Sequence, residues 1–316
     1  MSEQKCDVGR GITLCYETFG DPGDPPMLLV MGLGTQMIAW HEDFCRELAS
    51  HGYYVVRFDN RDIGHSTHLS GPPPTVRQLL TRSRSAARYS LADMAEDAAA
   101  LLGELGLAPA HVVGASMGGM IAQTIAARHP RSVRSLVSIM SNTGSLLSGQ
   151  PSLRVYSTFL REAPPGRDAY IRHMTAVFEL IGSPAPRRDL DQVRELIAQS
   201  YDRDHDPAGP GRQLAAIIAS GNRTPELRRI KAPTLVIHGA ADRLVSPSGG
   251  RATARAIRGA KLMMVEGMGH DLPHDLWPTV IEAVAGHARA ADIAAGAAVV
   301  TNGQRDPSLR AAPIPR

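Results

Sequence analysis

The stretch His111-Val-Val-Gly-Ala-Ser-Met-Gly-Gly-Met120 is the most informative part of this chain. Its two valines end a short apolar run that is typical of a buried strand, and residues 121–128 have the spacing of a helix. Between them, Gly114–Gly118 match the pattern G-x-S-x-G, in which a tight turn holds a serine in a strained conformation. We therefore expect Ser116 to expose its hydroxyl above the sheet, in front of the helix. The alternative is an ordinary glycine-rich turn between a strand and a helix.

Apolar runs and helical patterns alternate on both sides of this stretch. Strands are predicted at residues 27–31, 53–58, 133–140, 234–237 and 262–265. Such alternation is typical of an α/β fold with a mostly parallel, doubly wound sheet. From about residue 143 to 226 the periodicity is helical, with no strand pattern, which predicts a helical insertion that forms a lid over the C-terminal edge of the sheet.

The chain is thus expected to consist of a core and an insertion. The core is predicted from residues 1–142 and 227–290, and the helical lid from residues 143–226. Residues 291–316 are rich in Ala, Gly and Pro and have no apolar face, so we expect a disordered tail there.

Composition and charge exclude several classes of protein. The 316 residues are 43% hydrophobic with a net charge of +3, and no Lys/Arg block suggests a nucleic-acid partner. The three cysteines form neither a disulfide framework nor a zinc pattern, which favours a reducing compartment. Because the chain has no signal-peptide pattern and no membrane-spanning run, we expect a cytoplasmic protein without a membrane partner. The sequence carries no signal for the oligomeric state.

Two later strand ends supply candidates for the base and the acid that a nucleophilic serine needs. Asp242 lies in the loop after the 234–237 strand, and His270 follows the 262–265 strand. Glycines before His270 allow its loop to fold back toward Ser116. Catalytic groups gather at such carboxyl ends of parallel strands, and the chain order Ser, Asp, His is one that this arrangement uses.

Other residues compete for these two roles. His274 is the second candidate for the base, while His238 ends a strand and is expected to be a buried structural residue. Glu266 is an alternative acid, but its place in the same loop is expected to keep it from the far side of the His270 imidazole. Asp242 itself has the alternative role of a turn residue.

An oxyanion formed on attack by Ser116 needs two N–H donors. The first is predicted to be Met117, the residue after the serine, and the second Leu33, with Gly32 as the alternative. The polar segment 59–66 is interpreted as a structural turn without a catalytic role. Since no ligand set for a metal is present, we expect neither a metal nor a cofactor.

Taken together, the motifs Met31–Gly34, Phe58–Ser66, Gly114–Gly118, Pro233–Gly239 with Asp242, and Gly267–Pro273 resemble the α/β-hydrolase superfamily. The resemblance covers roughly residues 5 to 290 and is greatest to bacterial serine esterases of the aclacinomycin methylesterase type. It implies a Ser–Asp–His triad of Ser116, Asp242 and His270. The chain departs from many relatives at Met31-Gly32, where they have His-Gly, which affects the shape of the pocket and not the backbone donors.

The resemblance implies a serine hydrolase that cleaves a carboxylic ester through an acyl-enzyme on Ser116, with a small-molecule ester, such as a methyl ester, as substrate. The same triad serves lactone hydrolysis, C–C bond hydrolysis and cofactor-free perhydrolysis, and these remain alternatives. A non-catalytic binding module is a further alternative, but no triad member is missing. An aspartate nucleophile, as in dehalogenases and epoxide hydrolases, is disfavoured by Ser116.

Overall fold

The computed structural model describes residues 2–75, 77, 78, 81, 83–159, 163–185, 187 and 189–303. Its strands are β1 (Gln4–Asp7), β2 (Thr13–Phe19), β3 (Pro26–Val30), β4 (Tyr54–Phe58), β5 (Ala110–Ala115), β6 (Val133–Ile139), β7 (Thr234–Gly239) and β8 (Lys261–Val265). Its α-helices are α1 (Glu42–Ser50), α3 (Leu91–Glu104), α4 (Met117–Arg128), α5 (Leu153–Phe159), α6 (Arg167–Ile181), α7 (Leu190–Arg203), α8 (Gly209–Ser220), α9 (Thr224–Leu227), α10 (Ser248–Ala256) and α11 (Trp277–Gly303).

The strands form one sheet in the order β1-β2-β4-β3-β5-β6-β7-β8. β2 pairs antiparallel with β1 and β4, and every other pair is parallel. The predicted mostly parallel α/β sheet is therefore confirmed. The chain winds outward in opposite directions from β3 and β5, and in such sheets ligands bind outside the carboxyl ends of the strands at this switch point.

Alternating side chains of the strands build a core on each face of the sheet. On one face, Val112 and Leu136 pack with residues of α3, α4 and α10. On the other, Val113 and Val137 pack with residues of α1 and α11. Because side chains of a strand alternate between faces, the continuous apolar runs of the sequence are explained by burial on both sides.

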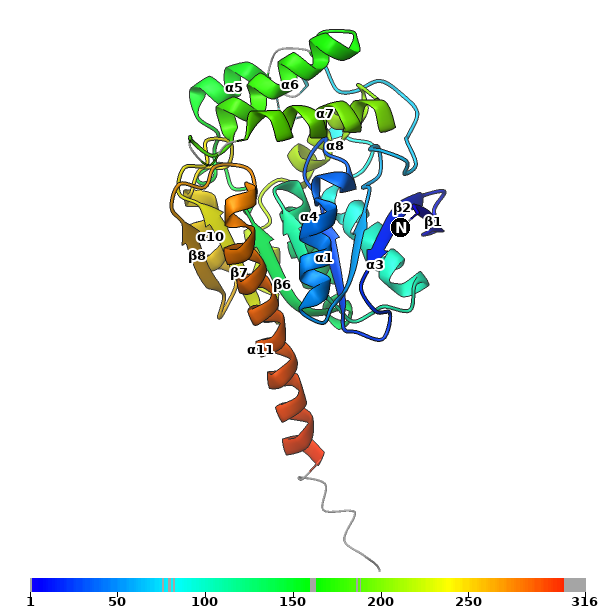
Figure 1. Ribbon diagram of the computed structural model, residues 1–316, viewed down its shortest axis with the longest axis vertical. Helices are drawn as coiled ribbons and strands as arrows, with labels where there is room; N and C mark the ends of the chain where they lie inside the picture. Colours follow the sequence, from blue (N-terminus) through cyan, green and yellow to red (C-terminus); the bar gives the residue numbers. More distant parts are fainter. Residues whose placement is uncertain are drawn as a thin grey trace, which may run out of the picture.

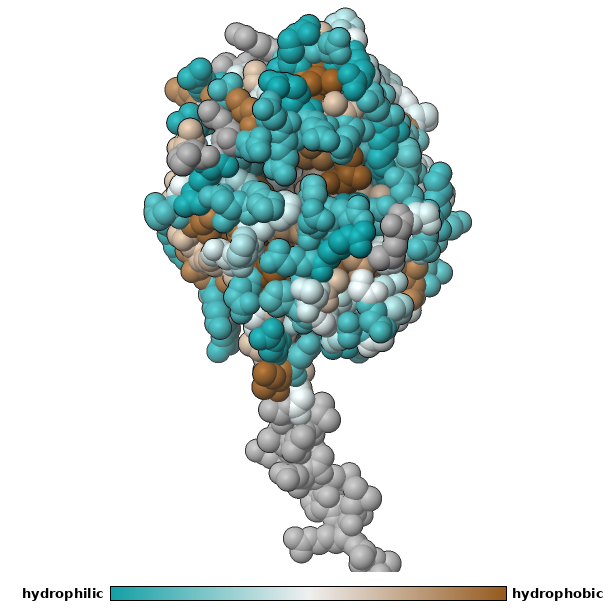
Figure 2. All heavy atoms as spheres, viewed as in Figure 1, coloured by the Kyte–Doolittle hydropathy of each residue, from teal (hydrophilic) through white to brown (hydrophobic). Residues whose placement is uncertain are grey.

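A long run of helices separates β6 from β7. We call residues 143–223, which contain α5 to α8, the helical segment. Figure 1 shows these helices gathered at one end of the sheet. In Figure 2 the visible face is largely hydrophilic, with small apolar groups, one of them between these helices and the body of the molecule.

The two ends of the helical segment lie side by side. The backbone N–H of Arg223 donates to the carbonyl of Thr143, 2.8 Å away. The buried guanidinium of Arg223 donates to the carbonyl of Asn142 and to Gln123 of α4. The segment therefore leaves the body and returns to it at one place.

The last helix, α11, runs away from the body of the molecule (Figure 1). The sequence predicts a disordered tail from residue 291, whereas α11 continues to Gly303. Alanine has the highest helix propensity, and no proline lies between Pro278 in the first turn and Pro307. The expected tail from residue 291 is thus helical up to Gly303, and residues 304–316 lie outside the described part. None of the described helices is long and apolar enough to cross a membrane.

Candidate active site

Ser116 lies between β5 and α4 in a backbone conformation that side chains rarely adopt. Its φ is 56° and its ψ is −120°. The close packing of this turn requires Gly118, because a Cβ at that position would lie 2.1 Å from the carbonyl oxygen of Val30. The helix begins at Met117, whose N–H has no acceptor within the helix. The turn therefore places a serine hydroxyl and a free N–H at the end of β5.

The structure brings Ser116, His270 and Asp242 into one hydrogen-bonded chain. Nε2 of His270 lies 2.9 Å from Oγ of Ser116, and Nδ1 of His270 lies 2.8 Å from Oδ2 of Asp242. These residues are separated in sequence but follow β5, β8 and β7, whose carboxyl ends share one edge of the sheet. The catalytic roles assigned to these residues remain predictions.

The second oxygen of Asp242 is used by its own loop. Oδ1 of Asp242 accepts hydrogen bonds from the N–H groups of Leu244 and Val245, at 2.9 and 2.8 Å. The carboxylate side chain is fully buried, and this arrangement aims Oδ2 at His270. With Nδ1–H donating to a carboxylate, Nε2 of a neutral imidazole is left to accept the Ser116 proton.

The competing residues lie in other surroundings. His274 packs against the ring of Trp277, with ring centroids 4.5 Å apart. Buried His238 has Nε2 2.8 Å from the carbonyl of Val245, and burial lowers its pKa. Glu266 is exposed, while the Nδ1 partner of His270 is Asp242.

The loop after β3 lies against the serine. A Cβ on Gly32 would lie 3.2 Å from Cβ of Ser116, so the backbone of this loop passes directly beside the hydroxyl. Two residues further along this loop, the N–H of Gly34 donates to Oε1 of Gln213 in α8. This hydrogen bond attaches the loop to the helical segment at the residue after Leu33. The assignment of Leu33 or Gly32, with Met117, to an oxyanion hole remains a prediction.

The segment 59–66 ties loops together, as its interpretation as a structural turn implies. Asp59 accepts hydrogen bonds from the N–H groups of Met37 and His65. Arg61 makes two hydrogen bonds to buried Asp97 of α3, at 2.5 and 2.6 Å. The turn therefore links α3 to the loops that surround it.

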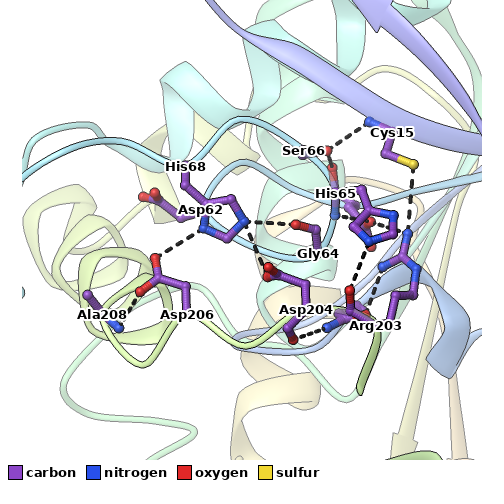
Figure 3. Close-up of polar contacts among 12 residues, drawn as sticks. Cys15, Asp62, Gly64, His65, Ser66, His68, Arg203, Asp204, Asp206 and Ala208 are labelled. Atoms are coloured by element: carbon purple, nitrogen blue, oxygen red, sulfur yellow. Dashed lines mark hydrogen bonds and ion pairs between the residues drawn. The ribbon is translucent and has the colours of Figure 1, made fainter. Parts of the chain in front are cut away.

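A cluster of charged residues joins the helical segment to this turn. We call it the charged junction, and Figure 3 shows most of it. Arg203 at the end of α7 donates to Asp59 at 2.6 Å. Arg212 of α8 donates to Asp62 and Asp206, at 2.8 and 2.6 Å. Its members are Asp59, Asp62, His68, Arg203, Asp204, Asp206 and Arg212.

The imidazole of His68 lies between two carboxylates of this junction. Nδ1 is 3.1 Å from Asp206 and Nε2 is 3.3 Å from Asp204, and Nε2 also lies 2.8 Å from the carbonyl of Gly64. Partial burial opposes the charged form, but the Gly64 carbonyl and the two carboxylates outweigh it and raise the pKa of His68 above its usual 6.5.

Two groups of side chains in the described part have the donors and spacing to hold a metal ion. They are Glu3 with Cys15 and His65, and Asp62 with His68 and Asp206. Arginine already neutralises the carboxylates of both: Arg203 donates to Glu3 at 2.7 Å, and Arg212 donates to Asp62 and Asp206. A cation would have to displace a guanidinium, which makes both groups poor metal sites.

The sequence interpretation did not identify the residues that attach the helical segment to the body. Gln213, Arg203 and Arg212 reach loops more than a hundred positions earlier in the chain. Ser183, which contacts the His270 loop, was also missed. No local motif surrounds these residues, so only the fold reveals their partners.

Comparison with known proteins agrees with this geometry. The α/β hydrolase fold family matches residues 25–275. The chain belongs to the α/β hydrolase family. The predicted resemblance to this superfamily and to bacterial methylesterases is confirmed.

Individual relatives act on different substrates. The chain is 28% identical to rhodomycin D methylesterase DauP of Streptomyces sp. (strain C5), over 89% of this chain and 97% of that protein. It is 25% identical to 3-oxoadipate enol-lactonase 2 of Acinetobacter baylyi, over 82% and 87% of the two chains. The solved enol-lactonase of Burkholderia xenovorans LB400 has the same fold, with a TM-score of 0.70 at 23% identity over 90% of this chain and 99% of that one.

Proposed function

We propose that this α/β hydrolase cleaves a carboxylic ester through an acyl-enzyme on Ser116. The observation that carries the proposal is the hydrogen-bonded chain from Asp242 through His270 to Ser116. A base within hydrogen-bond reach of a hydroxyl, itself oriented by a carboxylate, is the arrangement that activates a serine.

In the first half of the reaction, Oγ of Ser116 attacks the ester carbonyl while Nε2 of His270 takes its proton. The carbonyl oxygen becomes an oxyanion, to which Met117 and Leu33 donate their N–H groups, with Gly32 as the alternative to Leu33. His270 then protonates the alcohol, the C–O bond breaks, and the acyl group stays on Ser116.

In the second half, a water molecule replaces the alcohol. His270 takes a proton from the water, whose oxygen attacks the acyl carbon. The bond to Oγ breaks, Ser116 recovers its proton from His270, and the carboxylic acid leaves. Asp242 stabilises the imidazolium in both halves and stays ionised.

The relative named rhodomycin D methylesterase supports a methyl ester as the substrate class. The relative named enol-lactonase supports a second candidate, since a lactone is an internal ester that the same steps would open. In a lactone the alcohol stays attached to the acyl group, so no small alcohol is released.

We also propose that residues 143–226 act as a lid on a core of residues 1–142 and 227–290. Contacts of the helical segment with the loop after β3 and with the loop of His270 support this division. Lids of this kind gate access to a site and exclude water from it.

The test uses wild type and Ser116→Ala with a panel of methyl esters, longer alkyl esters and enol-lactones. Wild type should hydrolyse esters and be labelled on Ser116 by a fluorophosphonate probe, as intact and peptide mass would show. Ser116→Ala should lose activity by several orders of magnitude and remain folded. Turnover of lactones alone would favour the second candidate, and full activity of Ser116→Ala would contradict the proposal.

Dialysis against EDTA tests the expectation that no metal takes part. Activity should survive, since arginine occupies the two possible ligand groups. Loss of activity that an added divalent cation restores would show that the reaction is of another kind.

A further inference from the structure

Three consecutive residues, Gly269 to Asp271, bond to Ile181 and Ser183 at the end of α6. The N–H of His270 donates to the carbonyl of Ile181 at 2.9 Å. The N–H of Gly269 donates to Oγ of Ser183 at 2.8 Å. Oδ1 of Asp271 accepts from both the N–H and the hydroxyl of Ser183, at 2.9 and 2.5 Å. The backbone on each side of the imidazole is therefore attached to the helical segment.

The chemistry of a helix end explains this attachment. The last carbonyls of a helix have no N–H partner within it, and Ile181 is the last residue of α6. Gly269 lets the two backbones meet, because a Cβ there would lie 2.4 Å from the N atom of Ser183. The side chain of Ser183 is fully buried, so its hydroxyl and its two partners satisfy one another without water.

The helical segment also contacts the loop of Asp242. The N–H of Ser152, just before α5, donates to the carbonyl of Arg243 at 3.0 Å. Leu244, whose N–H binds Asp242, packs against an apolar cluster of α5 and α6 that includes Val155 and Ile181. Both the base and the acid thus depend on where α6 lies.

We infer that Ser183 is a positioning residue, which fixes His270 through Gly269 and Asp271 and so makes the activation of Ser116 depend on the docking of α6. The inference rests on the proposed function for its effect on turnover. The expected effect on the labelling of Ser116 is independent of the proposed function, because a fluorophosphonate reports an activated serine whatever the natural substrate is.

The experiment compares Ser183→Ala with wild type. The variant removes the hydroxyl and leaves the backbone in place. We expect kcat and the second-order rate of fluorophosphonate labelling to fall together by about 10- to 100-fold, the size expected for a small misplacement of a catalytic group. KM should stay close to the wild-type value, because the fully buried side chain of Ser183 is not accessible to a substrate.

Thr175→Val is the matched control. Thr175 is a buried residue of α6, and among the described residues its hydroxyl donates only to the carbonyl of Ile171 in the same helix. This variant should lose stability without a fall in labelling rate per folded molecule. Equal effects of Ser183→Ala and Thr175→Val on labelling would overturn the inference, since both would then be effects on packing alone.

A pair of substitutions at the partner covers the case in which Ser183→Ala does not fold. Asp271→Asn keeps an oxygen that accepts from Ser183, whereas Asp271→Ala leaves both donors of Ser183 without an acceptor. We expect Asp271→Asn to retain most of the labelling rate that Asp271→Ala loses. Equal labelling by the two, at wild-type rate, would overturn the inference. Wild-type enzyme that is labelled but hydrolyses no ester would contradict only the proposed function.

Discussion

Two of the attachments between the helical segment and the body differ in their chemistry. At the end of α6, backbone groups, the Ser183 hydroxyl and one carboxylate hold the loop of His270. At the charged junction, the guanidinium groups of Arg203 and Arg212 are paired with buried carboxylates. Short contacts to backbone fix geometry, while paired charges depend on each partner remaining present and ionised.

The difference separates two kinds of dependence. A substitution beside the triad should lower kcat and the labelling rate, because it moves His270 away from Ser116 or Asp242. Damage at the charged junction should appear in the free energy of unfolding, because a buried carboxylate is left without its cation. The following substitutions test this separation.

The largest effect is expected from Asp242→Asn. The side-chain amide keeps an oxygen for the N–H groups of Leu244 and Val245 but donates to Nδ1 of His270, which favours the wrong tautomer. We expect kcat to fall by up to about ten-thousand-fold. The free energy of unfolding, measured by chemical denaturation, should change little.

The matched variant is Glu266→Gln. Glu266 lies at the same edge of the sheet as Asp242, but it is exposed. The variant should retain wild-type turnover. If Glu266→Gln were inactive and Asp242→Asn active, Asp242 would be wrongly assigned as the acid. The comparison between the triad and the charged junction would then fail.

A smaller effect is expected from Arg212→Met, and it should be on the free energy of unfolding and not on the rate constants. The side chains of Arg212 and Asp62 are 4% and 0% exposed, so the substitution leaves a buried carboxylate without its cation. Breaking such a pair by removing one partner costs about 3–5 kcal/mol of the free energy of unfolding. The rate of fluorophosphonate labelling per folded molecule should stay near wild type.

Arg128→Met is the control, because Arg128 pairs with Glu226 but its side chain is 53% exposed. This variant should change the free energy of unfolding by less than about 1 kcal/mol. A loss of labelling rate in Arg212→Met without a loss of stability would show that the two attachments do not differ in kind.

The smallest effect is expected from His68→Gln, and it should depend on pH. The pKa of His68 is raised in the folded protein, so the charged imidazole stabilises the fold fully below the unfolded value of about 6.5. This contribution is lost as the pH rises through the folded pKa. Wild type should therefore exceed His68→Gln in free energy of unfolding at pH 5.5, and the difference should shrink by pH 9.

The comparison series uses His173→Gln, a histidine of α6 outside the charged junction. The difference between wild type and His68→Gln should change more with pH than the difference measured with this variant. A wild-type advantage over His68→Gln that grew toward pH 9 would have the wrong sign for a raised pKa and would contradict the role of Asp204 and Asp206.

The sequence predicted the sheet and the three residues of the hydrogen-bonded chain because each depends on a local pattern. Ser116 is marked by glycines whose close packing only glycine permits, and Asp242 and His270 lie in the loops that follow β7 and β8. In a parallel sheet, residues after neighbouring strands meet at one edge, so the local pattern suffices to bring distant residues together.

The attachments of the helical segment could not be predicted in this way. Ser183 and Gly269 are 86 positions apart, and Arg212 and Asp62 are 150 apart. A serine or an arginine in a helical pattern has many possible partners, and tertiary packing selects among them. The end of α11 was missed for the opposite reason, since alanine-rich sequence has high helix propensity without an apolar face.

The contact between Thr143 and Arg223 has a consequence for how such a chain can change over evolution. Since the two ends of the helical segment are joined by a hydrogen bond of 2.8 Å, a short turn would be enough to connect the flanking parts of the chain. Insertions at points where chain ends lie close together are well tolerated. Helices at this position can therefore be acquired, replaced or lost by recombination while the sheet and Ser116 are inherited unchanged.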